Sequence, residues 1–293
     1  QICYSTEAIN VNKESYKSSL ENEERGKEMV KIGKMSQADL AQLTAQRAQD
    51  EYSIVESESN VKNYKRQLKE LLQITNDEAF DIVVPTASDA QALGTIPSLN
   101  SVYASALDTR PEIKSYQNMI DQSDLNIAIA KAGKLPTISA NAGISTSTTS
   151  MNKDGWGSQI KQNFGVGGGI SVSIPICDNR ATKTAINKAN IQKQSSMLDL
   201  KDQQTKLYST IENYWLQANT NQSQFKAAKT STESAKTSYD LLSEQFKLGL
   251  KNIVELRTGK DNLLKAQQNE LQSKYLTLLN MGMLNFYKTG RVE

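Results

Sequence analysis

The chain has 293 residues, with 34 basic side chains, 32 acidic ones and no histidine. This balanced charge gives no strong positive field, so nucleic acid is not expected as a partner. Without histidine the chain lacks the commonest general base and the usual zinc or copper ligand, so we expect no enzyme, no cofactor and no metal. Hydrophobic residues make up only 38%, which favours a long, well-solvated structure over a compact core.

Membrane-spanning helices and disulfides are not expected either. No stretch approaches the roughly eighteen apolar residues that a spanning helix needs. Gln1 does not open a signal peptide, and the start is typical of the interior of a longer polypeptide. Two cysteines, Cys3 and Cys177, cannot build a disulfide framework. We expect Cys177 to be a small buried thiol.

A helical hairpin is predicted over residues 1–75. Its arms run over about 9–32 and 37–72, and its tip lies at 33–36. Gly33 stands where the helical pattern stops, and a glycine at that place usually ends a helix and turns the chain. The two arms are therefore expected to be antiparallel.

The following stretch, residues 76–109, is predicted to be an irregular connection. Pro85 and Pro97 interrupt it, and it shows little regular pattern. A helix is then expected over 110–135. Its start is indicated by Pro111, because proline is favoured in the first turn of a helix.

Between residues 136 and 178 the apolar pattern changes to a period of two. Two runs alternate in this way, separated by a polar loop with Trp156. The apolar or glycine positions are Ile138, Ala140, Ala142, Ile144, Val166, Gly168, Ile170, Val172 and Ile174. Two strands of this kind are typical of an outer-membrane barrel, and also of a ribbon on a soluble domain. A lone exposed hairpin is only marginally stable, so the adjoining coiled coil described next favours the barrel.

The longest pattern runs over 181–248 without a proline or a glycine. Two series with a spacing of seven, from Met197 and from Leu200, are apolar or aromatic at 12 of 16 positions. A strict heptad repeat predicts a left-handed coiled coil, here with a helix about 100 Å long. A tip at 249–252 and a return helix over about 253–287 complete a second hairpin, assigned to residues 181–288.

The two predicted hairpins repeat one another. Gly249 lies 216 positions after Gly33. The same offset pairs Asp39 with Glu255, Leu40 with Leu256, and Leu68 with Leu284. Such self-similarity indicates a duplicated unit. The second copy begins near Leu107, so about a hundred residues of the first copy, with a second pair of strands, are expected upstream of Gln1.

Short motifs stand at the ends of the predicted elements. They are Arg110-Pro111-Glu112, Ala132-Gly133-Lys134-Leu135-Pro136, Ile170-Ser171-Val172-Ser173-Ile174-Pro175-Ile176, Ile32-Gly33 before Asp39-Leu40, and Leu248-Gly249 before Glu255-Leu256. In their order and spacing over nearly the whole chain they resemble the TolC family of outer-membrane efflux proteins. The resemblance implies a mainly α fold of long antiparallel coiled-coil hairpins (an α-barrel), with a β-hairpin that contributes to a trimeric transmembrane β-barrel.

The resemblance also implies a function and partners. The chain would be the channel component of a tripartite efflux or type I secretion system, a passive exit duct gated at its periplasmic tip. It would be a homotrimer in the outer membrane of a Gram-negative bacterium, extending into the periplasm. Its hairpin tips would meet a periplasmic adaptor, which is bound to an inner-membrane pump.

Three charged residues match the family's pore gate. Glu255 matches an acidic position that lines the periplasmic constriction, although an ordinary solvated helix charge would look the same. Asp39 and Lys251 match positions that form charged links in the closed state. A surface pair contributes about 1 kcal/mol or less, which suits a gate that must open. Phe246 replaces a tyrosine of the family, so the complete clamp is not expected.

The tips are the predicted contact with the adaptor. The residues are Gly33, Lys34, Met35, Gly249, Leu250 and Lys251. Exposed apolar side chains of Met35 and Leu250 beside glycines would let another helical hairpin approach closely. The alternative is that these residues only turn the chain.

Two other functions fit parts of the pattern. A periplasmic adaptor also joins a helical hairpin to β-structure, but it would show one hairpin inside a split β-module. A structural coiled-coil protein without a pore would show the heptads but needs no apolar strand face. The repeated hairpins and the strands favour the channel over both.

Overall fold

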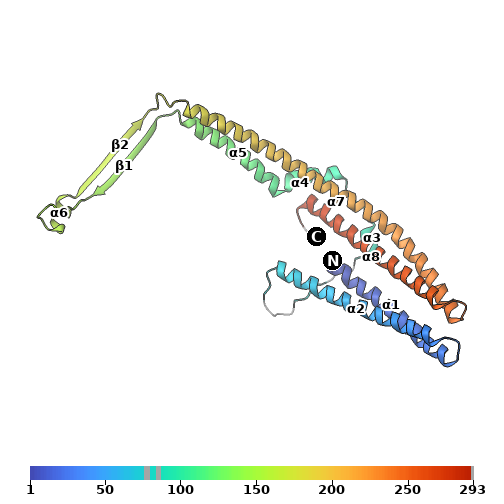
Figure 1. Ribbon diagram of the computed structural model, residues 1–293. Helices are drawn as coiled ribbons and strands as arrows, with labels where there is room; N and C mark the ends of the chain where they lie inside the picture. The colour runs from blue at the N-terminus through green and yellow to red at the C-terminus, as the bar shows by residue number, and fades with distance from the viewer. Residues whose placement is uncertain (76–79, 84–86, 292–293) are drawn as a thin grey trace. The chain divides into compact units, whose positions relative to one another are not determined.

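The computed structural model describes residues 1–75, 80–83 and 87–291. Pro85, which supported the prediction of an irregular connection, lies outside these ranges. Long helices dominate, and a two-stranded antiparallel sheet accompanies them (Figure 1). The predicted fold class, mainly α with long antiparallel hairpins and a β-hairpin, is confirmed.

The chain divides into two compact units. One consists of Gln1–Thr109 and Leu207–Glu293, and the other of Arg110–Lys206. Helix α7 (Ala181–Lys247) contributes to both, because it continues without a break for 67 residues. The boundary between the units falls inside α7, whereas the division predicted from the sequence starts its last part at residue 181.

Helices α1 (Ile2–Lys31) and α2 (Gln37–Leu71) form the first hairpin of the first unit (Figure 1). The turn between them lies where it was predicted. Helix α1 begins earlier than the expected Ile9. Its first turns pack on helix α8, where the rings of Tyr4 and Tyr275 meet edge to face with centroids 6.4 Å apart. This long-range packing is not visible in the periodicity of the N-terminal residues.

The stretch predicted to be irregular over 76–109 contains two helices, so this prediction is wrong. Helix α3 (Asp89–Ala92) begins with a capping box in which Ser88 and Gln91 bond each other's backbone N–H groups. Helix α4 (Leu99–Thr109) follows it and packs on α8. The side chains with no exposed surface here are Ala92, Val102 and Ala106. Burial of this small apolar set stabilises helices too short to show a clear period.

Helices α7 and α8 (Ile253–Thr289) form the second hairpin. Buried side chains recur along α7 at the predicted spacing: Ile211, Ala218, Phe225, Tyr239 and Phe246. The predicted heptad seam is therefore confirmed. Helix α8 is buried on more than one side, because it contacts α1, α3 and α4 as well as α7.

In the second unit, helix α5 (Pro111–Ala132) packs on the first part of α7. Pro111 occupies the first turn, as predicted. The Lys193 ammonium lies 2.7 Å from a carboxylate oxygen of Asp124, and the hydroxyls of Ser123 and Ser196 lie 3.3 Å apart. These contacts fix the register of the two helices.

The strands β1 (Thr137–Ser145) and β2 (Gly165–Ser173) pair in an antiparallel ladder. The loop between them contains a short helix, α6 (Trp156–Gln162), which the sequence did not indicate. Cys177, expected to be buried, is exposed. It lies in the irregular segment after β2, where no element covers it within the described residues.

Candidate functional site

The strand register places apolar side chains of both strands on one face. Ile138 pairs with Val172, and Ile144 pairs with Val166. The other face carries serine, threonine, asparagine and glycine, in pairs such as Ser139 with Ser171. The isoleucine and valine side chains are exposed, 71% for Ile138. An exposed apolar face of this kind needs an apolar environment.

The two hairpin tips share one backbone geometry. Gly33 and Gly249 have positive φ angles of 72° and 75°. In each tip the glycine N–H and the following N–H bond carbonyls three and five residues earlier, at 3.0 and 2.8 Å in the first tip and 2.9 and 2.9 Å in the second. This is the Schellman pattern, which satisfies the last carbonyls of a helix. It explains why a glycine stands at both places.

The return helices also begin alike. The Ser36 hydroxyl accepts the N–H of Asp39 at 3.1 Å, and the Asn252 side-chain oxygen accepts the N–H of Glu255 at 2.9 Å. Ser36 and Asn252 are separated by the same 216 positions as the two glycines. Each cap satisfies a backbone donor that the helix leaves free.

The structure brings two of the three predicted gate residues together. Lys251 and Glu255, one turn apart on the second tip, form an ion pair. Asp39 instead accepts a hydrogen bond from the Ser36 hydroxyl at 2.8 Å. Among the described residues no ion pair joins Asp39 to Lys251 within one chain. Glu255 is half-exposed and its charge is partly compensated by its own chain.

The apolar side chains at the tips differ from the prediction. Leu250 is 71% exposed, as expected. Met35 is not freely exposed, because it packs against a buried cluster that joins the hairpins: Leu43, Tyr239, Phe246, Ile253 and Leu256. Ile32 and Leu248, which sequence reasoning did not select, are exposed. Their position directly before the two turn glycines could have identified them in the sequence.

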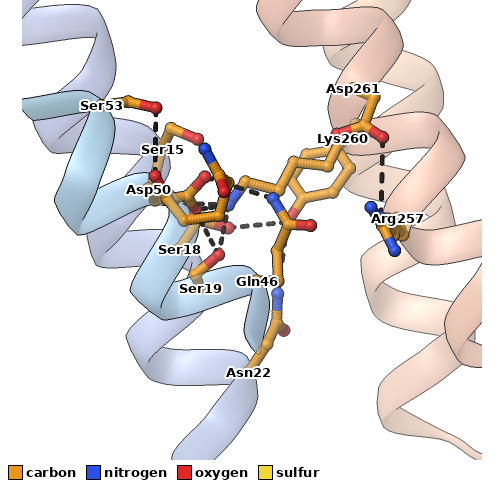
Figure 2. A network of polar contacts seen from close by, with 12 residues as sticks. Ser15, Ser18, Ser19, Asn22, Gln46, Asp50, Ser53, Arg257, Lys260 and Asp261 are labelled. Atoms are coloured by element: carbon orange, nitrogen blue, oxygen red, sulfur yellow. Dashed lines mark hydrogen bonds and ion pairs between the residues drawn. The ribbon is translucent and has the colours of Figure 1, made fainter. Parts of the chain in front are cut away.

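A buried ion pair joins the two hairpins where α8 meets α1 and α2 (Figure 2). The Lys260 ammonium donates to the Ser15 carbonyl at 2.9 Å and contacts the Ser19 hydroxyl and a carboxylate oxygen of Asp50. The Ser19 hydroxyl donates to the same carboxylate at 2.5 Å. Lys260 and Asp50 are each 5% exposed. We call Ser15, Ser19, Asp50 and Lys260 the Lys260 network.

In the Lys260 network, burying the charged groups costs free energy, and their pairing offsets part of that cost. Burial lowers the pKa of Lys260 because a dry environment disfavours its charge, and the Asp50 carboxylate opposes this effect. A buried pair of this kind gains little net stability, but leaving either partner alone is costly. This pair was not predicted from the sequence. The available signal was Lys260 itself, a charge four residues after Leu256 on the buried stripe of α8.

Further polar contacts continue this seam toward the tips. The Tyr239 hydroxyl lies 2.6 Å from the Ser18 hydroxyl and accepts from the Asn22 amide at 3.3 Å. Arg25 donates to the Lys247 carbonyl at 3.3 Å. The seam between the hairpins is therefore mostly polar, with one apolar cluster near the tips.

Helix α3 is attached to both arms of the second hairpin. An Asp89 carboxylate oxygen lies 2.7 Å from the Lys229 ammonium, and the other lies 3.4 Å from that of Lys274. The Lys229 hydrogen bond lowers the pKa of Asp89. The Gln222 amide donates to the carbonyls of Ala92 and Gly94 at 2.9 and 2.8 Å. These bonds fix the connection that leaves the first hairpin.

Within residues 1–75, 80–83 and 87–291, no cluster of three histidine, cysteine, aspartate or glutamate side chains is arranged to bind a metal ion. Across the same ranges, no helix combines the length and the apolarity needed to cross a membrane.

Comparison with known proteins identifies the family. The model of the outer membrane efflux protein family matches residues 102–281, more than half of the chain. The chain belongs to this family of outer-membrane proteins. The resemblance predicted from the short motifs is confirmed, and the efflux family is not one of enzymes.

The relatives of this efflux protein are distant and longer. It is 23% identical over 262 residues to the outer membrane efflux protein BepC of Brucella suis biovar 1 (strain 1330), covering 89% of this chain and 54% of BepC. It is 22% identical over 285 residues to the toxin and drug export protein A of Aggregatibacter actinomycetemcomitans, covering 94% of this chain and 58% of that protein. The chain thus spans little more than half the length of these curated relatives.

Solved structures show the same fold. The outer membrane channel CmeC of Campylobacter jejuni superposes with a TM-score of 0.72 at 20% identity, covering 99% of this chain and 60% of that one. At this identity the likeness concerns the fold alone.

Proposed function

We propose that this efflux protein is the outer-membrane channel component of a tripartite efflux or type I secretion system. It would act as a passive exit duct, a homotrimer that extends from the outer membrane of a Gram-negative bacterium into the periplasm. The observation that carries the proposal is the apolar face shared by β1 and β2, in a chain that otherwise forms long helical hairpins. An outer-membrane strand needs lipid on one side and a polar lumen on the other.

Among the residues that the structure describes, β1 and β2 pair only with each other, so the ladder has two open edges. Open edges do not persist in lipid, because their backbone groups have no water to bond. Strands from elsewhere in the protein or from other copies are therefore required. A duct built from several copies supplies them.

The tips are the proposed gate and the proposed contact with a periplasmic adaptor and its inner-membrane pump. Glu255 from three copies would form a carboxylate ring that attracts cations. The Lys251 ion pair within each chain moderates this charge. Ile32, Leu248 and Leu250 are the exposed apolar side chains that an adaptor hairpin would cover. Gly33, Lys34 and Gly249 would allow close approach, while Met35 supports the tip from within.

Reconstitution in planar lipid bilayers tests the proposed duct. The full-length protein should give discrete conductance steps, and cross-linking in detergent should give a trimer. A protein that inserts but never conducts, at any voltage or acid pH, would instead be a structural coiled-coil protein. A protein that neither inserts nor forms trimers, but binds both a pump and a channel, would be an adaptor.

The gate has its own test. Replacing Asp39 and Lys251 with alanine should raise the open probability, because both are proposed to link the closed tips. Lys265→Ala, an exposed lysine farther along α8, is the matched control. An unchanged open probability removes Asp39 and Lys251 from the gate but leaves the duct intact.

A further inference from the structure

The loop between β1 and β2, residues 146–164, is held together by polar contacts. The side chain of Gln159 at its centre is 1% exposed. The Gln159 oxygen accepts the N–H of Thr149 at 2.8 Å, and its amide donates to the Asp154 carbonyl at 2.6 Å. The interior of this loop is therefore a satisfied amide rather than an apolar side chain.

The apolar side chains of the same loop are exposed instead. Trp156 is 70% exposed, Ile160 45% and Phe164 60%. These three positions are four residues apart, so they follow one face of α6 and its C-terminal end. We call Trp156, Ile160 and Phe164 the loop stripe. A buried amide under exposed apolar side chains reverses the usual arrangement in water, which indicates an apolar environment.

The loop leaves the two strands without a change of register. The ladder ends with Ser145 opposite Gly165. Two positions farther on, the Asn163 amide donates to the Ser147 carbonyl at 2.6 Å. The position between these two pairs belongs, by alternation, to the face that carries isoleucine and valine. Phe164 occupies this position, so the loop stripe begins where the apolar face of the strands ends.

A further bond attaches α6 to the same face. The Thr146 hydroxyl donates to the Ile160 carbonyl at 3.0 Å. Thr146 follows Ile144 by two positions, so by alternation it shares the side of the ladder on which Ile144 lies. The last turn of α6 is therefore fixed beside the apolar face. The loop stripe extends the surface that the proposed duct turns toward lipid.

Two exposed lysines border the loop stripe. Lys161 follows Ile160 on α6, and Lys153 lies in the loop before the helix. Against one acidic residue, Asp154, they leave the loop with a net positive charge. A lysine stem can lie along apolar surface while its ammonium reaches a polar group. Aromatic and basic side chains together are typical of a helix at the boundary of an anionic lipid surface.

Resting on the proposed duct, we propose that the loop stripe inserts into the surface of the membrane beside the barrel, with Lys153 and Lys161 on the phosphates of anionic lipids. Because β1 follows α5 and β2 leads into α7, the loop lies at the other end of the ladder, on the outer side of the membrane. Gln159 keeps the stripe in place, because its two bonds fix the loop that carries it.

Spin labels report the surroundings of α6 in the full-length protein, after its native cysteines, Cys3 and Cys177 among them, have been replaced by serine. The label is attached at Ile160→Cys in one variant and at Ser158→Cys in another. Ser158 is exposed on the opposite face of α6, so it is the matched control. The proteins are reconstituted in vesicles of phosphatidylethanolamine and phosphatidylglycerol. Collisions with oxygen, which concentrates in lipid, are compared with collisions with a water-soluble nickel chelate.

The label at Ile160→Cys should collide more often with oxygen, and the label at Ser158→Cys more often with nickel. The first label should lie about 5–10 Å below the phosphates, the usual depth of an interfacial helix. Lys153→Gln with Lys161→Gln should reduce this depth, and so should vesicles of phosphatidylcholine alone, which carry no net charge. Lys188→Gln, at an exposed position of α7, should not. An unchanged depth in the double variant would show that the two lysines do not bind lipid phosphates.

A third label, at Ile144→Cys on the apolar face of β1, separates this inference from the proposed duct. Oxygen contact at Ile144→Cys with nickel contact at Ile160→Cys would overturn the inference and leave the duct intact. Nickel contact at both positions would contradict the duct itself. A label at Ile160→Cys that neither reagent reaches would place α6 against protein, over the mouth of the duct or under a partner, and would also overturn the inference.

Discussion

The two hairpins of this efflux protein share one plan at their tips and differ along their arms. Each tip has a glycine with positive φ, the same pair of backbone hydrogen bonds and a capped return helix. Farther from the tip, the side chains between the arms are no longer the same. Backbone geometry permits few residues at a turn, whereas many side-chain sets fill the space between two helices.

The packing of the arms shows this most directly. A Cβ atom added at Gly26 would lie 2.6 Å from Leu43, and one added at Gly259 would lie 2.6 Å from Leu242. The offset of 216 makes Gly26 the counterpart of Leu242, and Leu43 the counterpart of Gly259. Glycine and leucine have thus changed places between the arms. In each hairpin a glycine on one arm therefore faces a leucine on the other, although the residue on each arm differs.

The polar contacts have diverged further. In the first hairpin Glu23 is buried and pairs with Arg47 at 2.7 Å and Lys27 at 3.0 Å. Its counterpart is Tyr239, whose hydroxyl bonds Ser18 of the other hairpin. The first hairpin therefore uses this position to join its own arms. The second uses it to bind its neighbour.

The largest expected effect comes from breaking the ion pair between Lys260 of the second hairpin and Asp50 of the first. Lys260→Ala leaves Asp50 buried without its charge partner, which costs about 3–5 kcal/mol. Amide hydrogen exchange of α2 and α8 measures the loss, as a fall in the free energy of local opening.

Two further variants show whether this loss arises from unpaired charge. Lys265→Ala, on an exposed position of α8, should change the opening energy by less than about 0.5 kcal/mol. Lys260→Met combined with Asp50→Leu removes both charges and should be within about 1 kcal/mol of the original protein. A loss as large in the double variant would mean that side-chain packing matters more than charge.

Substitutions at the two tips are expected to cost less than Lys260→Ala, and to cost the same at both tips. Gly33→Ala and Gly249→Ala each place a side chain at positive φ, which costs about 1–2 kcal/mol. Neither added Cβ meets another atom within 4 Å, so the backbone alone determines the cost. Exchange rates of the tip amides should therefore rise by the same factor in both variants.

Gly282 provides the control for the tips. It lies inside α8 with open space around it and no positive φ. Gly282→Ala should stabilise the helix by about 1 kcal/mol. Unequal costs at Gly33 and Gly249 would show that the tips are not equivalent.

Alanine substitutions at Gly26 and Gly259 should lower the free energy of unfolding by different amounts. Gly26→Ala crowds Leu43 at 2.6 Å and also Leu40 and Met35 at 3.4 Å, whereas Gly259→Ala crowds Leu242 alone at such short range. Overpacking costs about 1–3 kcal/mol and alanine in a helix regains about 1 kcal/mol. A net loss of about 1 kcal/mol is expected for Gly26→Ala, and a smaller one for Gly259→Ala.

A double-mutant cycle checks the cause. Leu242→Ala should relieve Gly259→Ala, so the two changes together should cost less than the sum of each alone. Additive costs would mean that the alanine does not contact Leu242. The arms would then be farther apart than the structure shows.

Sequence reasoning was most reliable where the signal is local or periodic. The heptads from Ile211 to Phe246 predicted the buried seam of α7, because every seventh residue faces the same neighbour. The glycines at 33 and 249 predicted the turns, because few residues tolerate positive φ. The alternation of the strands predicted their apolar face for the same periodic reason.

It failed where a contact depends on distant parts of the chain. Lys260 meets Asp50 across 210 positions, and no local pattern reports such a pairing. Helix α4 was missed because its buried Val102 and Ala106 pack on α8 rather than repeating along a long helix. Met35 was assigned to an exposed tip because the packing of the tip residues on Leu43 could not be foreseen.

The smallest expected effect concerns the position that has changed from Glu23 to Tyr239. Burial raises the pKa of Glu23. Hydrogen bonds from Lys27 and Thr44, together with the charges of Lys27 and Arg47, lower it by more than burial raises it. The pKa of Glu23 therefore lies below its ordinary 4.5. The folded state therefore binds fewer protons than the unfolded state just below pH 4.5. The stabilisation that the Glu23 carboxylate contributes is complete above that pH and is lost as the pH falls through its pKa in the folded state.

Thermal unfolding measured from neutral to acid pH tests this difference between the hairpins. Glu23→Gln should flatten the acid limb of the curve, whereas Tyr239→Phe should leave its slope unchanged because no carboxylate is removed. Glu24→Gln, at an exposed position beside Glu23, is the matched carboxylate control. An acid limb that persists in Glu23→Gln would mean that other carboxylates determine it.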